Sequence, residues 1–539
     1  MAPRERVKAD SRLDRVIEAV SPSWALARRR ARVGLAMTAA WGQGGYVGAS
    51  KKRTATQEWR ATALSPNDAL LPDLVVLRDR SQDSVRNNAI ARGAVNGVVT
   101  SVVGTGLQAR PRLDRKALGL TDAQAEAWQA EALHWWNAWA YSQECDFGRS
   151  LTFDEVQRVA FRSVLVDGDH FAAKRFVERP GSSFGLKAQL ISAARVCNPN
   201  RSADSATVRA GVEFDPESGA PLAYHVASRH PDETLRGNGQ LWWARVPAFG
   251  KESGQRQVLH LFRPLEAGVL RGEPYLAPVL EILRQCGTYT NAELMAAVVN
   301  SCFAVVTKTQ NGDGVDQAES GAKDEKNDPI VLGKEGTIVD LGLDESIESF
   351  TPGRPNSGFD PFMTAMLRQI GMALEIPYEV LIKHFQASYS AARGSLLEAW
   401  RFYRGLREWL AWSLCQPFYE AVITEVVARG WMGAPGFLAD PLVRAAWCGC
   451  EWYGQAPGSL DPLKEVEAVG KAVEYRLTTR ERGTIELNGG DYTANHKQLV
   501  REAQDAREGG LVPSPQQQGN TSPDPAEPPD RNDRNDKES

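Results

Sequence analysis

The sequence predicts an α+β fold, in which long helices alternate with one stretch of short strands. Apolar residues recur with helical spacing over 79–103 and 121–140, and again over 277–299 and 390–415. Residues 185–262 instead contain short apolar runs separated by Pro- and Gly-containing turns, which is typical of β-structure. No repeat of about 20 to 50 residues is visible, so the sequence does not predict a solenoid or a propeller.

The composition is that of a large globular protein. Of 539 residues, 42% are hydrophobic and 24% are charged, and the formal net charge is -4. The first residues, MAPRERVKAD, contain no apolar signal region, and no uninterrupted apolar run reaches about 18 residues. The seven cysteines are scattered, which favours a reducing compartment over a disulfide framework. We therefore expect neither a membrane span nor a secreted protein.

Charge is distributed unevenly along the chain. Residues 1–60 contain 13 Lys and Arg against 5 Asp and Glu, whereas residues 311–350 contain 11 acidic residues against 3 basic ones. The simplest interpretation of both stretches is a solvated segment. We expect 1–60 to be basic and partly disordered, and the Pro- and Asp-rich residues 511–539 to form a disordered tail.

Local signals set the helix ends in the first half of the chain. Helix 79–103 should end at Gly104-Thr105-Gly106, and Thr121 is a suitable N-cap for the next helix. Residues 151–177 should begin as a helix, break at Asp167-Gly168-Asp169 and continue as a strand.

The second half contains two helices that flank short β runs. We expect a helix over 277–299, three β runs at 303–309, 329–333 and 337–341, and a helix over 358–375.

A long aromatic-rich helix follows after the polar insert Lys383-His384-Phe385-Gln386, and Ser388 or Ser390 is the simplest N-cap. Pro417 should kink this helix or restart it, and Gly430 should end it.

Four motifs could suggest enzyme chemistry, and each has a simpler explanation. Gly104-Thr105-Gly106 lacks the further glycine or Gly-Lys-Ser/Thr ending of a nucleotide loop, so it predicts a helix end. Gly333-Lys334-Glu335-Gly336 is best explained as a hairpin turn. Cys448-Gly449-Cys450 has no nearby second pair to complete a metal site. His384 with Ser388 or Ser390 lacks a nucleophile elbow. The sequence therefore predicts no catalytic, cofactor-binding or metal-ligating residue.

Several sequence blocks nevertheless follow a recognisable order along the chain. They are Leu77-Arg78-x-Arg80-Ser81 with Arg86-Asn87-Asn88, His260 with Arg271-Gly272-x-Pro274, Ile376-Pro377-Tyr378-Glu379-Val380-Leu381 with Tyr389-Ser390-x-x-Arg393, and Asp461-Pro462-x-Lys464-Glu465. Over roughly residues 24–510, this order resembles the lambda-type family of portal proteins of tailed bacteriophages. Gln82 departs from the family, which has a basic residue there.

The resemblance implies a structural protein of the virion, assembled in the bacterial host cytoplasm. Such proteins form a ring, usually a dodecamer, at one capsid vertex, and double-stranded DNA passes through it independently of sequence during packaging and ejection. The implied partners are the large terminase subunit, head-completion or adaptor proteins, and the major capsid or scaffold protein. No cofactor is implied.

The resemblance also implies a domain plan. The parts of the portal-protein fold are an α/β wing (61–270), a two-helix stem (271–302 and 358–376), a small β-containing clip (303–350), a tunnel loop (380–389), a long kinked wing helix (390–430) and a helical C-terminal crown (431–510). In this plan the polar insert is the tunnel loop, and Lys383, His384 and Gln386 face the DNA. Assembly and helix positions are Tyr389, Ser390, Arg393, Trp400 and Tyr403.

Two expectations remain open at this point. Aromatic residues on several sides of 390–429 predict that a neighbouring copy covers part of this helix. The alternative function is an enzyme or nucleotide-dependent factor of phage assembly that uses the Gly104–Gly106 or His384 region.

Overall fold

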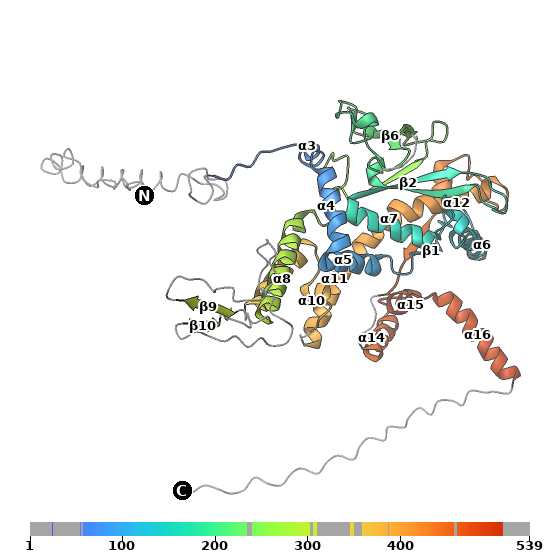
Figure 1. Ribbon diagram of the computed structural model, residues 1–539. Coiled ribbons are helices and arrows are strands. Elements are labelled where there is room, and N and C mark those ends of the chain that lie inside the picture. Colours follow the sequence, from blue (N-terminus) through green and yellow to red (C-terminus); the bar gives the residue numbers. More distant parts are fainter. Residues whose placement is uncertain are drawn as a thin grey trace, which may run out of the picture. The chain divides into compact units, whose positions relative to one another are not determined.

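The structure is a computed structural model, and it describes most of the chain. The described residues are 24, 54, 58–233, 240–301, 305–309, 345–349, 358–385, 388–456 and 461–509. The chain divides into two compact units, Met1–Ser65 and Pro66–Ser539, and all elements discussed below belong to the second (Figure 1). Gln386, the two β runs expected at 329–333 and 337–341, the tail and nearly all of 1–60 lie outside the described residues.

The first long helix of the prediction is in fact two helices. The elements are α3 (Pro66–Leu70), α4 (Leu74–Asn87) and α5 (Ala89–Val102). Asn88 is extended between α4 and α5, and its side chain accepts hydrogen bonds from the N–H groups of Ile90 and Ala91. The single-helix prediction was wrong because an Asn side chain can cap a new helix even where apolar periodicity continues.

The next two helices agree with the prediction. Helix α6 (Asp122–Ala140) starts at a capping box formed by Thr121 and Gln124. Helix α7 (Phe153–Asp167) ends at Gly168, whose φ of 88° is accessible mainly to glycine, and strand β2 (Asp169–Phe176) follows directly.

The β-rich region forms two antiparallel sheets. One has the order β3 (Leu186–Ile191), β2, β8 (Val258–Phe262), and the other has the order β4 (Val208–Arg209), β5 (Val212–Phe214), β6 (Pro221–Ala227), β7 (Trp243–Pro247). Helix α7 packs against the three-stranded sheet (Figure 1). Short 3-10 turns lie at η2 (Gln143–Cys145), η3 (Ala193–Arg195) and η4 (Pro199–Arg201).

Two helices flank the next pair of strands, as the sequence predicted. The turn η5 (Ala277–Val279) leads into α8 (Leu280–Ser301), and α9 (Phe359–Ala373) packs against α8. Between them, β9 (Val305–Thr309) pairs antiparallel with β10 (Glu345–Ser349). Strand β10 was not expected, because its sequence ESIES lacks the apolar alternation of a half-buried strand.

The short helix α10 (Tyr378–Ile382) precedes the polar insert. After the insert, a long helix runs without a break through α11 (Tyr389–Leu410), the π-helical turn η6 (Ala411–Cys415) and α12 (Gln416–Ala428). Pro417 lies in the first turn of α12, so the proline is accommodated by the widened turn before it. Gly430, with φ 72°, follows the C-cap residue Arg429 as predicted.

The chain then returns to the first half of the molecule. Helix α13 (Pro441–Trp447) precedes β11 (Cys450–Tyr453), which pairs antiparallel with β1 (Gln108–Pro111). The last helices are α14 (Pro462–Glu474), α15 (Arg480–Asn488) and α16 (Tyr492–Glu508).

Three of the seven aromatic residues between Trp400 and Tyr419 are buried inside the subunit, and three more are partly buried. Tyr403, Phe418 and Tyr419 belong to one large apolar cluster that also includes residues of α5, α6 and α7. Trp412 is exposed over 61% of its surface. Helices distant in sequence therefore cover part of the aromatic surface, and coverage of the remainder by a neighbouring copy stays a prediction.

Candidate functional site

The polar insert lies between the ends of two packed helices. Helix α9 ends at Leu374, and the chain reverses at Glu375, whose φ is 54°. The N–H of Ile376 donates to the carbonyl of Gly371 at 2.9 Å. A Cβ at Gly371 would lie 2.6 Å from the carbonyl oxygen of Ile376, so this reversal requires glycine.

The single turn of α10 then leads into the insert. It ends at Lys383, which is left-handed with φ 56° and ψ 36°, and the N–H of His384 donates to the Glu379 carbonyl at 3.1 Å. Lys383, His384 and Phe385 are all exposed. We call residues 380–389 the hinge. Its exposed cationic side chain can contact an anionic surface without desolvation of a buried charge.

Side chains hold the segment that leads into the hinge. The hydroxyl of Tyr275 donates to the carbonyl of Leu374 at the end of α9. The hydroxyl of Ser395 on α11 donates to Glu379 of α10 at 3.3 Å. The guanidinium of Arg368 lies 5.4 Å from the ring centroid of Tyr378. The hinge therefore starts from a defined place, and one contact connects α10 before it to α11 after it.

The assembly residues named from the sequence do not form one cluster. Arg393 and Ser390 are exposed, whereas Tyr403 is buried and lines the same 580 Å³ groove against α5 as Lys383. Trp400 is half-buried under the guanidinium of Arg407, at 4.9 Å. Tyr389 begins α11 after the N-cap Ser388, which makes no side-chain capping bond.

A buried ion cluster connects α4, β2 and the loop that leads to α8. The carboxylate of Asp169 is fully buried and pairs with Arg78 at 2.7 Å and with Arg271. His260 contacts the same carboxylate at 3.2 Å. Arg271 also donates to the carbonyls of Val196 and Ala193. One arginine thus joins β2 to the 3-10 turn η3 that follows β3.

Charge balance keeps this cluster ionised. Burial would raise the pKa of Asp169, but Arg271 and Arg78 overcome that effect and lower the pKa well below its ordinary value. Burial lowers the pKa of Arg78 to about 10 and lowers that of His260. The cluster therefore holds the ionised carboxylate of Asp169 between the guanidinium groups of Arg78 and Arg271. Burial disfavours protonation of the neighbouring His260 imidazole.

Backbone packing beside the cluster is close. A Cβ at Gly168 would lie 2.3 Å from the carbonyl oxygen of Gly272, and a Cβ at Gly272 would lie 2.1 Å from that of Gly168. Glycine is required on both sides of this contact. The chain from Gly272 runs directly to Tyr275 and then into α8.

The cluster explains three of the residues that carried the family resemblance. Arg78, His260 and Arg271 belong to different sequence blocks, and the fold brings all three to Asp169. Sequence reasoning missed the role of Asp169 and treated its neighbourhood only as a turn. Gln82 also contributes, because its amide donates to Asp167 at 2.8 Å.

Comparisons with known proteins identify the family. The family model described as "Phage portal protein, lambda family" matches residues 52–407. The chain belongs to the lambda family of phage portal proteins. It is 27% identical over 480 residues to Portal protein B of Escherichia phage lambda, which covers 85% of this chain and 89% of the relative. It is 27% identical over 481 residues to the Portal protein of Escherichia phage N15, which covers 84% of this chain and 89% of the relative.

Solved structures are more distant. A chain from the virion of a native gene transfer agent particle superimposes with a TM-score of 0.37 and 14% identity, covering 70% of this chain and 93% of that chain. A chain from the neck of the native particle, computed with C12 symmetry, gives a TM-score of 0.37 and 12% identity, covering 78% and 94%. At this level of superposition they add no argument about function.

Family membership makes this chain a portal protein, a structural conduit in DNA packaging and not an enzyme. The portal structure also removes the physical basis of the nucleotide alternative. Gly104 and Gly106, with φ 58° and 116°, follow the C-terminal end of α5, where carbonyl oxygens and not N–H groups face outward. A Cβ at Gly106 would meet Asp154 at 2.2 Å.

The other residues that could suggest enzyme chemistry, the Cys448–Cys450 pair and His384, do not form a reactive site among the described residues. Cys448 is buried and Cys450 is partly buried, and burial raises the pKa of both thiols. Among the described residues, no group of three or more potential ligands could hold a metal ion. His384 makes no ring hydrogen bond to another described residue, so no base for Ser388 or Ser390 is assembled. A search of the described helices finds none with the length and apolar character of a membrane span.

Proposed function

We propose that copies of this portal protein form a ring, a dodecamer as is usual in the family, at one capsid vertex, and that the hinge lines the channel for double-stranded DNA. Membership in the portal family supports the ring and the conduit. The observation that supports the hinge assignment is the exposure of Lys383 and His384 on a segment that joins α10 to α11, two helices connected by the Ser395–Glu379 hydrogen bond. Gln386 is the third proposed channel residue.

The charge of the hinge suits a conduit. Every phosphate that a basic side chain neutralises adds salt-dependent affinity, so a channel lined by many cations would hold its cargo. Between Tyr378 and Ser388, the sequence supplies one lysine per copy and no arginine. Because contacts to phosphate carry no sequence information, DNA of any sequence can pass through such a channel.

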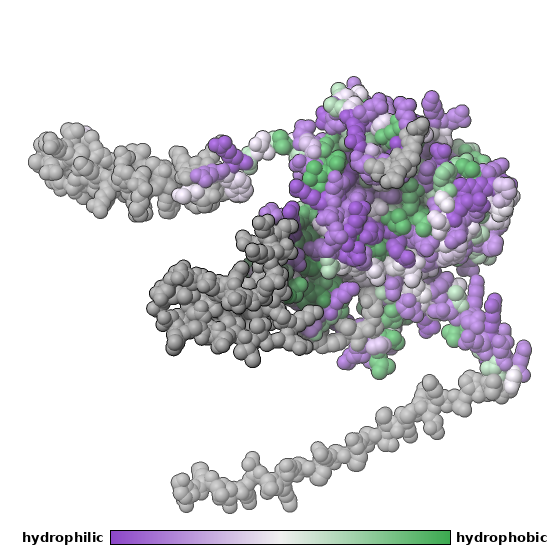
Figure 2. Space-filling model, in the orientation of Figure 1, coloured by the Kyte–Doolittle hydropathy of each residue, from purple (hydrophilic) through white to green (hydrophobic). Residues whose placement is uncertain are grey.

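Exposed apolar surface on the two stem helices supports assembly. Leu294 and Met295 of α8 are each 62% exposed, and Met372 of α9 is 84% exposed. Figure 2 shows an apolar area at the place of α8 in Figure 1. A neighbouring copy in the ring would remove these side chains from water.

The finer partner assignments follow from the family plan. The acidic segment 311–350 lies between the stem helices in sequence and is the proposed docking region for the large terminase subunit and head-completion proteins. Contact with the major capsid or scaffold protein, and DNA ejection through the same channel as a head–tail connector, belong to the same proposal.

A packaging assay on assembled proheads tests the hinge assignment. The double variant Lys383→Ala, His384→Ala should assemble rings with wild-type yield in electron micrographs, because exposed substitutions change stability by about 0.5 kcal/mol or less. DNA packaging or retention should change. Arg401→Ala is the matched control, since Arg401 is an exposed cation of α11 paired with Glu398. Wild-type packaging and retention by the double variant would reject the hinge as a channel element.

A further inference from the structure

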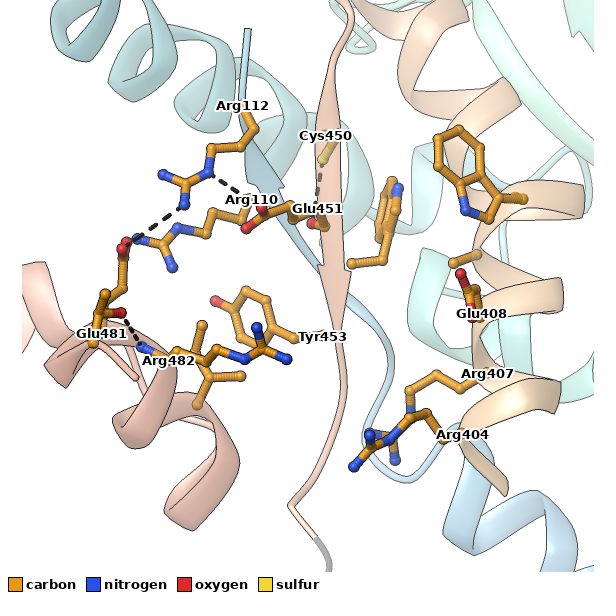
Figure 3. Close-up of a pocket in the computed structure, with 15 residues that line it drawn as sticks. Arg110, Arg112, Arg404, Arg407, Glu408, Cys450, Glu451, Tyr453, Glu481 and Arg482 are labelled. Carbon is orange, nitrogen blue, oxygen red and sulfur yellow. Dashed lines mark hydrogen bonds and ion pairs between the residues drawn. The ribbon is translucent and has the colours of Figure 1, made fainter. Parts of the chain in front are cut away.

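A second pocket lies away from the hinge, between the β1–β11 pair, α11 with its π turn, and α15 (Figure 3). Its volume is about 640 Å³. The charged lining consists of five arginines and three glutamates: Arg110, Arg112, Arg404, Arg407, Arg482, Glu408, Glu451 and Glu481. Arg482 is already paired with Glu486, which lies outside the lining, so one net positive charge remains and the pocket favours an anionic group.

The excess charge is located on the α11 side. Arg110 and Arg112 on the opposite wall both pair with Glu481. Arg404 pairs with no carboxylate of the described residues, and the guanidinium of Arg407 donates to backbone carbonyls, including that of Val102 at 3.0 Å. Burial, with a further contribution from Arg404, lowers the pKa of Arg407 to about 10. An anion placed beside Arg404 and Arg407 would relieve this repulsion.

Aromatic rings line the same pocket. Trp412 lies in the π turn η6 and is 61% exposed, whereas the other aromatic residues between Trp400 and Tyr419 are buried or partly buried. Trp452 and Tyr453 contribute further aromatic lining. The indole N–H of Trp452 donates to Gln416 at 3.1 Å, which fixes that ring. Aromatic-lined grooves bind proline-rich segments in the extended polyproline conformation.

We propose that this pocket docks residues 521–538 of the portal's own C-terminal tail, TSPDPAEPPDRNDRNDKE. This stretch contains six acidic residues against three basic ones, a net charge of 3 − 6 = −3, and four prolines. The carboxylates of the tail can pair with Arg404 and Arg407 of α11, and its prolines can pack against the ring of Trp412. A proline-rich segment also loses less conformational entropy on docking than a flexible one does.

The length of the chain allows this contact. Helix α15 lines the pocket and packs against α16, which has 17 residues and is therefore about 25 Å long. Residues 510–520 can extend about 36 Å, since an extended chain spans about 3.3 Å per residue. The tail can thus turn back along the whole of α16 and reach the pocket.

Mixed charge favours the tail over the DNA backbone as the occupant. Three glutamates in the lining oppose a polyanion. The basic residues of the tail, Arg531, Arg534 and Lys537, can instead approach Glu408, for which the described residues supply no ion pair. Contact with DNA is therefore an alternative outcome of the test.

Photo-cross-linking in the full-length protein tests the docking. With benzoylphenylalanine at Asn532, cross-links should map to peptides containing 404–412 or 479–485. The charge reversal Arg404→Glu should lower their yield about fivefold or more, the effect of losing about 1 kcal/mol of ion pairing. Asp530→Arg with Asp533→Arg should restore the yield in that background.

The matched control is Arg401→Glu on the same helix, which should leave the cross-links unchanged because Arg401 is already paired with Glu398 and lies outside the pocket. Unchanged circular dichroism shows that Arg404→Glu folds. Mixing isotope-labelled and unlabelled copies tells whether the tail docks on its own subunit or a second copy, and either result supports docking. Cross-links that ignore Arg404→Glu, or protection of 404–412 by duplex DNA while the tail cross-links elsewhere, would overturn the proposal.

Discussion

The substitution Asp169→Asn should destabilise the portal subunit severely while changing its shape very little. It removes one negative charge and leaves the guanidinium groups of Arg78 and Arg271 buried, with side chains 8% and 1% exposed. Removing one partner of a buried ion pair typically costs about 3 to 5 kcal/mol, because the remaining charge has no compensation. This cluster loses the counter-charge of two cations, so we expect a loss at the upper end of that range.

The assay is urea unfolding followed by tryptophan fluorescence, with Glu213→Gln as the matched control. Glu213 also receives two hydrogen bonds from an arginine, Arg245, at 2.7 and 2.8 Å, but Arg245 is 53% exposed. Exposed pairs contribute about 1 kcal/mol or less, so the control should unfold nearly as the wild type does. A loss for Asp169→Asn within about 1 kcal/mol of the control would refute the anchoring role of the cluster.

Three further predictions concern the same subunit. Burial lowers the pKa of His170 from 6.5 to about 4, so the unfolded chain binds a proton that the folded chain excludes. Stability should therefore fall by about 3 kcal/mol as the pH is lowered from 7 to 4, and His170→Phe should remove that share in urea titrations at both pH values. Gly168→Ala should cost several-fold more in thermal unfolding than Gly181→Ala, because both have positive φ but a Cβ at Gly181 meets nothing within 4 Å. Tyr403→Ala should cost about 3 to 5 kcal/mol in urea unfolding, and a loss below about 1 kcal/mol would contradict its place in the core.

The sequence predicted an element correctly where a residue at its end carries a local signal for that end. Thr121 predicted the start of α6 by capping it, and Gly168 predicted the break between α7 and β2. Asn88 carries an equally local signal, but the apolar periodicity continues across it and hides the break. Strand β10 has no such signal, because its pairing with β9 and not its own composition determines it.

The ion cluster could not be predicted from spacing. Arg78 and Arg271 lie 91 and 102 residues from Asp169, and no periodicity connects positions so far apart. The family resemblance singled out both arginines and His260 without a physical reason for them. The reason is tertiary, since a buried carboxylate needs compensating charge from elements that the fold brings together.

The anchor and the hinge are parts of one mechanical arrangement. Arg271 is held at Asp169, the chain continues over four residues to Tyr275, and the hydroxyl of Tyr275 reaches the carbonyl of Leu374 where α9 ends. Our proposal that the hinge lines the DNA channel requires a loop that passing DNA does not reshape, so the chain beside it must be held more strongly than its side chains bind phosphate. Buried charge pairing holds the segment that leads to Tyr275, whereas an exposed cation such as Lys383 gains little from any single phosphate. In that proposal, this difference in strength would allow repeated contact without capture.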